Sequence, residues 1–425
     1  MASEQVQKKG GFHYAFLIVA AGIAITCIPC ALVLSCAGIY FTPVSNYFGV
    51  PKASFTLYFS ILNLAMMIML PIGGKLMSKM DARAVLSAAV IIDGLTLIAM
   101  SFFTAVWQFY IAGVLLGIGT APLIYLAVPS LINAWCKKKV GFFIGLCMAF
   151  TGIGGAIWSA VFTALRADGM DFHTIYLIWA VIAAVTSLPF TLLCVRSKPE
   201  DCGLQPYGAA AAAAAAGTAP KASGLSASRA MKTPTFYAAC VFAGIINIAI
   251  LIAMQFPSYT KTLTSAPFDV AVVGGLMTTV MMVGQALFKV ILGGAADKSA
   301  KGALVFAFCA GVAGILLCWF GAGTELMLYA GAFIFGGCYA TAVVLVPVVV
   351  RQSFGSREYS LIYSRVSTVF NLIAAFASMI WAWVQTSFGF NVVFITGLIM
   401  LVVILLLGLY VMQSAKKYKS EWTTD

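Results

Sequence analysis

Charged residues are scarce in this chain and set the first limits on what it can be. Of its 425 residues, 9% are charged and 62% are hydrophobic, a composition that excludes a soluble domain and indicates a polytopic membrane protein. Histidine occurs only twice, at His13 and His173, so no histidine-based metal site is expected. No G-x-x-x-x-G-K-S/T phosphate-binding loop is present, which argues against an ATP-driven pump, and no cofactor is expected.

Long apolar runs dominate what remains. About twelve of them are long enough to cross a bilayer as helices. The predicted spans are residues 12–40, 52–77, 84–103, 107–134, 140–165, 173–195, 233–260, 268–294, 302–321, 325–350, 358–386 and 389–413. The 11 cysteines lie mostly inside these runs, where a thiol behaves as a small hydrophobic group, so no disulfides are expected.

The basic residues predict how the chain is oriented. If the gaps between spans are assigned alternately to the two sides of the membrane, 20 of the 25 Lys and Arg residues fall on the side that holds both termini. Basic loops stay in the cytoplasm, so a multi-pass protein of the plasma (inner) membrane with both termini cytoplasmic is expected. The net charge of +12 is then explained by contact with anionic lipid headgroups, and no nucleic-acid partner is expected.

The chain also divides into two related halves. A polar segment, 196–232, contains a run of alanines and separates an N-terminal six-helix bundle (1–195) from a C-terminal one (233–425). Gly73 and Gly74 end the second span, and Gly293 and Gly294 end the eighth, each pair before a charged turn. Two related six-helix halves joined by a long loop are typical of transporters whose substrate site lies between the halves near the midplane.

Several stretches carry a family resemblance over nearly the whole chain. The two-times-six layout and the turn Gly293–Lys298 resemble the major facilitator superfamily. Within it, four further segments are similar to the branch of oxalate/formate exchangers and monocarboxylate transporters: Gly38–Val50, Asn133–Gly141, the segment R-S-K-P-E-D-C-G-L-Q-P-Y-G at 196–208, and Pro347–Tyr363. The resemblance implies an all-α membrane fold of 12 transmembrane helices in two pseudo-symmetric bundles, and carboxylate transport.

The charged turns depart from the family pattern in the first half. Ser78 stands where the superfamily usually has Asp, and Asp81 where it usually has Gly. The resemblance implies that this motif latches the halves together in the outward-open state, so the first copy is in doubt. Asp297 and Lys298 keep the second copy and are predicted to take part in gating.

Three charged residues fall inside predicted spans and are functional candidates, because a charge inside a bilayer is costly. Lys289 lies eight residues, or ~12 Å, before Asp297, near the midplane. The resemblance places the branch's substrate-binding cation, usually Arg, at this position. The alternative is a lysine that extends to the membrane edge.

Arg365 and Asp93 are the other two candidates. Arg365 could line the same cavity, or could anchor the helix at the interface and pair with Glu358; the branch's second cation corresponds to Phe370 here. Asp93 could couple transport to protons, or could be a hydrogen-bonded packing residue.

Polar and aromatic residues are predicted to complete the substrate site. They are Tyr125, Tyr339, Trp158, Asn63, Asn247 and Gln285. Tyr125 and Tyr339 match aromatic cavity positions of the exchanger relatives. Gln285 stands where proton-coupled relatives place Asp, which favours exchange or uniport.

The leading hypothesis is therefore a secondary transporter of a small organic anion, a monocarboxylate before a dicarboxylate. It would work as a monomer by alternating access, with a counter-anion or a proton as the coupled species. Efflux of a hydrophobic or drug-like solute is the alternative within transport. A signalling membrane protein would need a soluble domain, and an enzyme would need a catalytic constellation; neither is evident in the sequence.

Overall fold

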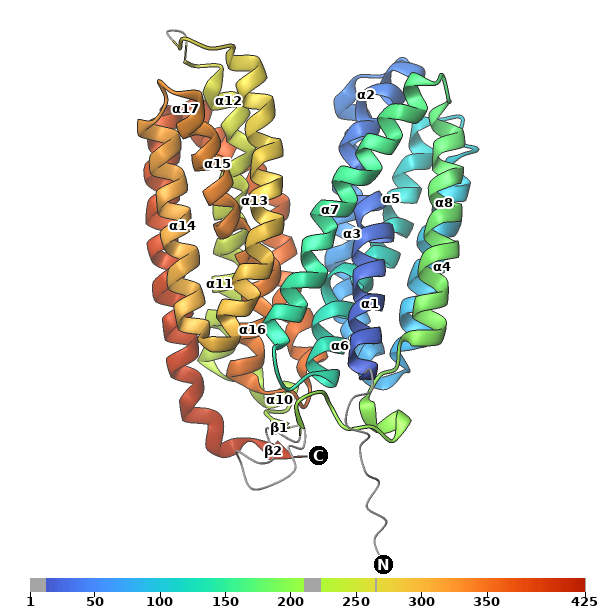
Figure 1. The fold of residues 1–425 in the computed structure, drawn as a ribbon, viewed down its shortest axis with the longest axis vertical. Coiled ribbons are helices and arrows are strands. Elements are labelled where there is room, and N and C mark those ends of the chain that lie inside the picture. Colours follow the sequence, from blue (N-terminus) through green and yellow to red (C-terminus); the bar gives the residue numbers. More distant parts are fainter. Residues whose placement is uncertain (1–12, 210–222, 264–265, 425) are drawn as a thin grey trace, which may run out of the picture.

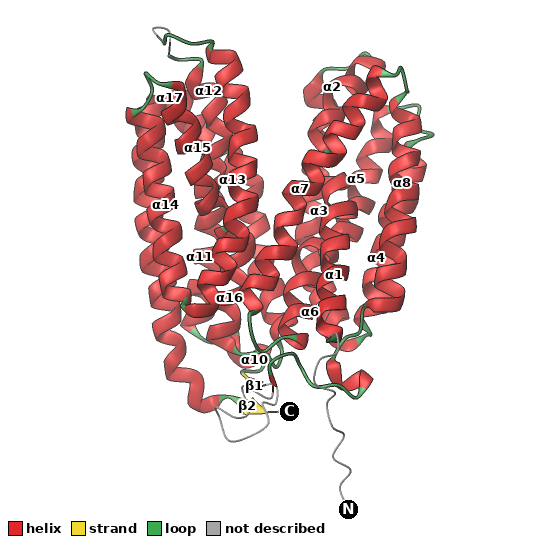
Figure 2. Cartoon of the chain, in the orientation of Figure 1, coloured by secondary structure: helices red, strands yellow, loops and turns green. Residues whose placement is uncertain are grey.

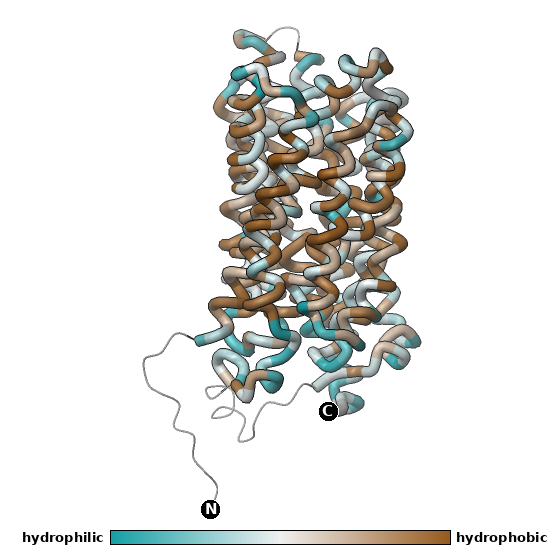
Figure 3. The backbone as a smooth tube through the Cα atoms, turned by 90° about the vertical axis from the view of Figure 1, so that its right-hand side faces the viewer, coloured by the Kyte–Doolittle hydropathy of each residue, from teal (hydrophilic) through white to brown (hydrophobic). Residues whose placement is uncertain are grey.

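The computed structural model describes residues 13–209, 223–263 and 266–424 of the chain. In this described part, twelve helices are long and apolar enough to cross a membrane, as the sequence predicts. Figure 1 shows them in two groups that pack side by side, and Figure 2 shows that almost all of the structure is helical. The hydrophobic residues form a broad central band, and hydrophilic residues gather at the two ends (Figure 3).

The first group, here called the N-half, contains six spans. Its elements are α1 (Tyr14–Ile25), η1 (Thr26–Ser35), α2 (Ala37–Tyr47), α3 (Lys52–Lys79), α4 (Ala82–Met100), α5 (Val106–Ala121), η2 (Pro122–Ala127), α6 (Val128–Trp135), α7 (Val140–Ala167), α8 (Phe172–Pro189) and η3 (Phe190–Cys194). The elements η1, η2 and η3 are π-helical, and Pro29 and Pro122 fall within two of them, because proline cannot donate to the ordinary helical ladder. The first span reaches Tyr47, beyond the predicted residue 40, because the helix continues past the apolar run.

The second group, the C-half, contains the other six spans. Its elements are α11 (Pro234–Ile250), η5 (Leu251–Gln255), α12 (Phe256–Thr260), α13 (Val270–Lys298), α14 (Ala300–Phe320), α15 (Glu325–Tyr339), α16 (Thr341–Phe354), α17 (Tyr359–Ser414) and η6 (Ala415–Glu421). Helix α17 holds two spans, which reverse at Gly389, where φ is +77°. A left-handed conformation of this kind favours glycine.

The two ends of the described chain lie at the same end of the molecule, called here the terminal end (Figure 1). There, the described parts of the connecting segment contact both halves. They are η4 (Pro199–Cys202), β1 (Ser223–Gly224), which pairs with β2 (Thr423–Thr424), and α10 (Ala227–Ala230). Tyr207 exchanges backbone hydrogen bonds with Trp135 and Lys137 of the N-half, and Leu225 donates to the carbonyl of Phe354 in the C-half. The division of the chain at 195/196 and 232/233 stays our proposal.

The two halves meet most extensively where α7 crosses α13. Gly141 and Gly145, one turn apart on α7, face Gly293 and the backbone of Lys289 on α13. A methyl group on Gly141 would lie 2.5 Å from the Gly293 carbonyl oxygen, and one on Gly145 would overlap with the Lys289 carbonyl oxygen. Small residues thus bring two helix backbones into direct contact, as in other membrane helix pairs.

The ribbons of the halves lie close at the terminal end and spread apart toward the opposite end (Figure 1). Contacts between the halves follow the same pattern: Ser360 donates to Ser130 at 2.9 Å, and Arg351 donates to the Cys136 carbonyl at 3.4 Å. Further along α7, a methyl group on Gly152 would lie 3.6 Å from Ala286, an ordinary van der Waals distance. The helices are therefore tightest near the terminal end.

We predict that Gly145→Ala lowers the melting temperature of the purified protein by about 2 °C or more, because the added methyl group forces α7 and α13 apart. Gly152→Ala is the matched control, since it adds the same methyl group on the same helix where there is room. Melting curves in detergent measure both variants. Equal melting temperatures for the two would contradict the importance of this crossing.

Candidate functional site

Lys289 lies between the two halves and is almost fully buried. From α13 it reaches across to α7, where its Nζ donates to the Met148 carbonyl at 3.3 Å and to the Thr151 Oγ1 at 3.0 Å. Within the described residues, no carboxylate forms an ion pair with it. The ammonium is thus held by neutral oxygens alone and does not extend to the membrane edge.

The close contact of α7 and α13 at Gly145 explains the direction of the Lys289 side chain. Gly145 lies against the Lys289 backbone, so the lysine side chain runs along α7 from there. Met148 and Thr151 follow Gly145 by one and about two helical turns, on the same side of α7. Thr151 is partly exposed, and the exposed Ser35 donates to its backbone carbonyl at 3.1 Å. The polar group that holds the lysine therefore lies next to an accessible surface.

A second group of polar residues joins the halves around Tyr125. The Tyr125 ring, on η2, packs edge-on against Phe370 of α17 with centroids 6.2 Å apart, and its hydroxyl lies beside Asn371. Tyr339 and Tyr363 lie near enough for their hydroxyls to influence that of Tyr125 electrostatically. Tyr125 and Tyr339, the two predicted cavity tyrosines, thus come from opposite halves and lie within electrostatic reach of each other.

The other predicted polar residues lie within one half. Trp158 donates to the Cys27 carbonyl at 2.8 Å, and Asn63 donates to Phe59 on its own helix at 2.7 Å. Asn247 donates to the Phe370 carbonyl at 3.2 Å and ties α11 to α17. Gln285 is half-buried one turn before Lys289 on α13, which makes it the member of this set beside the cation.

Arg365 lies on a different face from these groups. It is exposed, and it shares its face of α17 with exposed Leu372, Phe376, Met379 and Trp383, at spacings of 7, 11, 14 and 18 residues. Glu358, the partner considered for Arg365, accepts instead from the Ala227 backbone at 2.8 Å. The structure does not bring Arg365 to Lys289.

Asp93 is buried inside the N-half, between α4 and α5. Its Oδ2 accepts from Thr120 at 3.0 Å, and its Oδ1 has no hydrogen-bond partner in the described part of the chain. Gly119 provides the space for the carboxyl group. This arrangement agrees with the packing alternative, and a role in proton coupling stays a prediction.

Asp297 joins the halves at the terminal end. Its two carboxylate oxygens accept from the backbone N–H groups of Gly141 and Phe142 at 2.7 and 2.8 Å. These are free donors at the first turn of α7, where a negative charge is stabilising. Lys139, just before this turn, has a φ of +56°, a strained conformation for a residue other than glycine. Lys298 is exposed, and its side chain forms no ion pair within the described residues.

The corresponding turn of the first half makes no such bridge. Ser78 donates to the Lys75 carbonyl on its own helix at 2.8 Å. Asp81 accepts from Arg83 and Ser197, and neither of these residues belongs to the C-half. The departure seen in the sequence thus has a structural counterpart, with one carboxylate bridge between the halves instead of two.

Comparison with known proteins fits this architecture. The family model described as "Major Facilitator Superfamily" matches residues 23–274 and 268–424. The chain belongs to the Major Facilitator Superfamily. As a member of this family of transporters, it is 26% identical over 145 residues to Monocarboxylate transporter 12 of Rattus norvegicus, an alignment that spans 34% of this chain and 30% of the relative.

Solved structures of other superfamily transporters share the fold. A double-tryptophan mutant of XylE, a proton:xylose symporter, matches with a TM-score of 0.69 and 13% identity over 96% of this chain and 99% of its own. The human organic anion transporter MFSD10 (TETRAN) matches with a TM-score of 0.68 and 14% identity over 93% of this chain and 99% of its own. At these identities the likeness concerns the fold.

Sequence reasoning missed several members of the site. Thr151 and Met148 were not singled out, although a threonine six residues after a glycine in the middle of span five is a detectable signal. Asn371 was also missed, and only its neighbour Phe370 was considered. Backbone carbonyls such as that of Met148 carry no sequence signal at all, because every residue has one.

We predict that Asp297→Asn loosens the terminal end and speeds alkylation of Cys136, because the amide is a weaker acceptor for the α7 N–H groups. Cys136 is fully buried beside this junction, and burial raises the pKa of its thiol to about 12, so it reacts slowly while the end is closed. Peptide mass spectrometry after maleimide treatment measures the rate.

Asp81→Asn is the matched control for this experiment, since it makes the same change in the turn that does not bridge the halves. The exposed Cys202 provides the internal reference for reagent activity. Equal alkylation of Cys136 in the two variants would remove Asp297 from the closure of this end.

Proposed function

We propose that this transporter moves a small organic anion, a monocarboxylate, across the membrane by alternating access, and that Lys289 binds the carboxylate. The observation that carries the proposal is a buried ammonium at the junction of the halves with only neutral partners. The name of the similar rat protein, a monocarboxylate transporter, supports the same substrate class.

Electrostatics favours an anionic substrate at this position. A buried ammonium loses several kcal/mol of hydration, which a carbonyl and a hydroxyl replace incompletely. A carboxylate about 4 Å away would contribute about 4 kcal/mol of attraction at an effective dielectric constant of 20. Since one lysine provides one fixed charge and Arg365 lies on another face, a single carboxylate matches the site better than two.

Lys289 also links substrate binding to the motion of the halves. Its ammonium belongs to the C-half and both of its acceptors belong to the N-half, so in this conformation it holds the halves together. A carboxylate that takes over the ammonium would release Thr151 and Met148, and the halves could then rock around the bound anion. Tyr125 and Tyr339, one from each half, would close around it.

We place the terminal end in the cytoplasm of a plasma membrane because most basic residues gather there. The same reasoning makes this conformation outward-facing, since the halves are closed at the terminal end. All the groups invoked come from one chain, so a monomer is sufficient for the proposed cycle.

We predict that Lys289→Ala abolishes saturable carboxylate uptake into proteoliposomes, and that Lys289→Arg retains part of it because the charge is kept. Arg365→Ala is the matched control, since it removes a membrane cation outside the cluster and should leave uptake near the wild-type rate. Unchanged uptake by Lys289→Ala would exclude the lysine from the mechanism and favour the alternative of hydrophobic or drug-like solute efflux.

We predict further that uptake is accelerated when the vesicles contain a carboxylate. The empty transporter is held by Lys289, Thr151 and Met148, so its return should be slow unless an anion frees the ammonium. Labelled substrate uptake with and without internal unlabelled substrate measures this acceleration. Equal rates, together with alkalinisation of the external medium, would instead indicate proton symport.

A further inference from the structure

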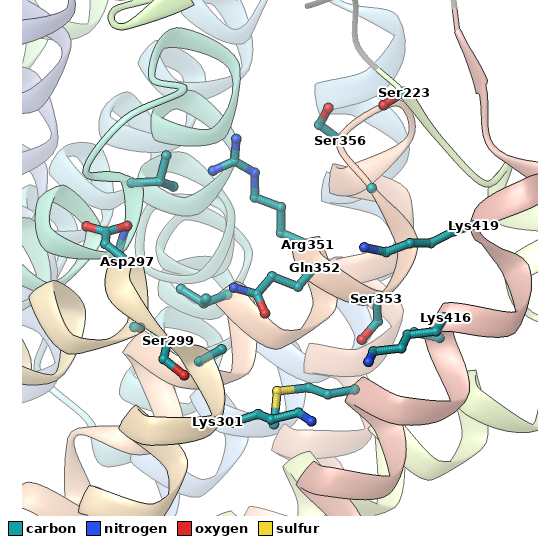
Figure 4. A pocket seen from close by; sticks show the side chains of 18 of the residues that line it. Ser223, Asp297, Ser299, Lys301, Arg351, Gln352, Ser353, Ser356, Lys416 and Lys419 are labelled. Carbon is teal, nitrogen blue, oxygen red and sulfur yellow. The ribbon is translucent and has the colours of Figure 1, made fainter. Parts of the chain in front are cut away.

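A cavity of about 700 Å³ opens at the terminal end, about two helical turns along α13 from Lys289. Its walls come from both halves and from the end of the chain, with η6 on one side and the ends of α13 and α16 on the other. Figure 4 shows Lys416 and Lys419 entering the cavity from the side opposite Asp297, with Arg351 and Gln352 between them.

The lining is strongly basic. Five cationic side chains and one carboxylate, Asp297, line the cavity; the cations are Lys137, Lys301, Arg351, Lys416 and Lys419. Within the described residues none of the five forms an ion pair, since the ion pairs found there join Arg83 to Asp81, His173 to Asp171 and Arg229 to Glu421. Asp297 is already engaged by the N–H groups of α7.

Two of the cations, Lys137 and Arg351, lie close to each other. Burial, and then the nearby Arg351 guanidinium, lower the pKa of the Lys137 ammonium. Among the described residues, the Arg351 side chain has a single hydrogen bond, a long one of 3.4 Å to the Cys136 carbonyl. Like charges around a hollow raise the electrostatic potential inside it and attract anions.

Neutral donors line the same cavity. The hydroxyl of buried Ser353 and the indole N–H of Trp422 have no hydrogen-bond partner in the described part of the structure. Lys419 lies over the Trp422 ring at 5.7 Å, which holds this part of η6 and its lysine beside the cavity.

We propose that this cavity binds a compact, multiply charged phosphate-bearing anion, either the headgroup of a membrane lipid or a soluble polyphosphate. A phosphate group offers several acceptor oxygens and more than one negative charge, which suits an array of lysines and an arginine. A monocarboxylate would leave most of the five cations without a counter-charge. The site is separate from the proposed substrate site.

Binding here would favour the conformation in which the terminal end is closed. Lys137 and Gly141 belong to the N-half, while Lys301, Arg351 and Lys416 belong to the C-half, so separation of the halves takes the cavity apart. A ligand that binds one conformation in preference to the other shifts the population toward it. The bound phosphate would thus regulate the rate at which the transporter changes to its inward-facing conformation.

The test uses the full-length protein in nanodiscs at physiological salt, with two probes. Sodium tripolyphosphate is added to nanodiscs of neutral lipid, and phosphatidylinositol bisphosphate is incorporated in a second set. The variant Lys416→Gln with Lys419→Gln removes two exposed cavity cations, and Lys417→Gln with Lys232→Gln removes two exposed cations outside it. The melting temperature is followed as a function of probe concentration.

We expect the wild type and the control variant to show a saturable rise in melting temperature, and the cavity variant to bind about tenfold or more weakly. A response to tripolyphosphate assigns a soluble ligand, and a response to the lipid alone assigns a headgroup. Absence of a saturable response to both probes, or equal weakening in both double variants, would overturn the proposal.

Discussion

The close crossing of α7 and α13 is the constraint on which the rest of the structure depends. Gly141 and Gly145 allow the backbone of α7 to touch that of α13 at Gly293 and Lys289. In a bilayer, lipid tails are as apolar as the side chains, so helix association relies on close packing and on polar contacts between helices. Here both occur at the same crossing, because the contact between glycines also brings the polar groups of the two halves within reach.

Two polar links depend on that approach. At the terminal end, Asp297 of α13 accepts from the first N–H groups of α7, and further into the membrane Lys289 of α13 donates to Met148 and Thr151. One link is an anion on backbone donors and the other is a cation on neutral acceptors. Neither charge has an ion-pair partner within the described residues, but the second is a cation, so of these two links only it gives a substrate anion an electrostatic reason to bind.

The number of spans follows from the sequence because apolar length is a physical requirement of a bilayer. The superfamily fold follows from the resemblance of segments such as the turn Gly293–Lys298. The position of Lys289 also follows, since it lies a fixed number of residues before the Gly-rich turn. The partners of Lys289 do not follow, because one is a main-chain carbonyl and the other depends on which face of α7 meets α13.

Arg365 shows the opposite difficulty. The position of Arg365 along α17 suggests that it lines the cavity. Helical phase instead places it on one face with exposed apolar residues such as Phe376 and Met379. Sequence gives the phase of each helix but not the direction in which its neighbour lies. The cavity lined by Lys137, Arg351 and Lys419 is similarly hidden in the sequence, where these residues appear only as members of separate basic loops.

The most direct test of an uncompensated cation in the transport path is a thermal-shift comparison of matched solutes, each carboxylate paired with its own primary amide. The two members of a pair share size and shape and differ in charge, so packing cancels between them. If Lys289 receives the substrate, the carboxylate raises the melting temperature of the wild type, the amide does not, and the difference disappears in Lys289→Ala. Equal stabilisation by both members of a pair, or an unchanged difference in Lys289→Ala, would contradict the account.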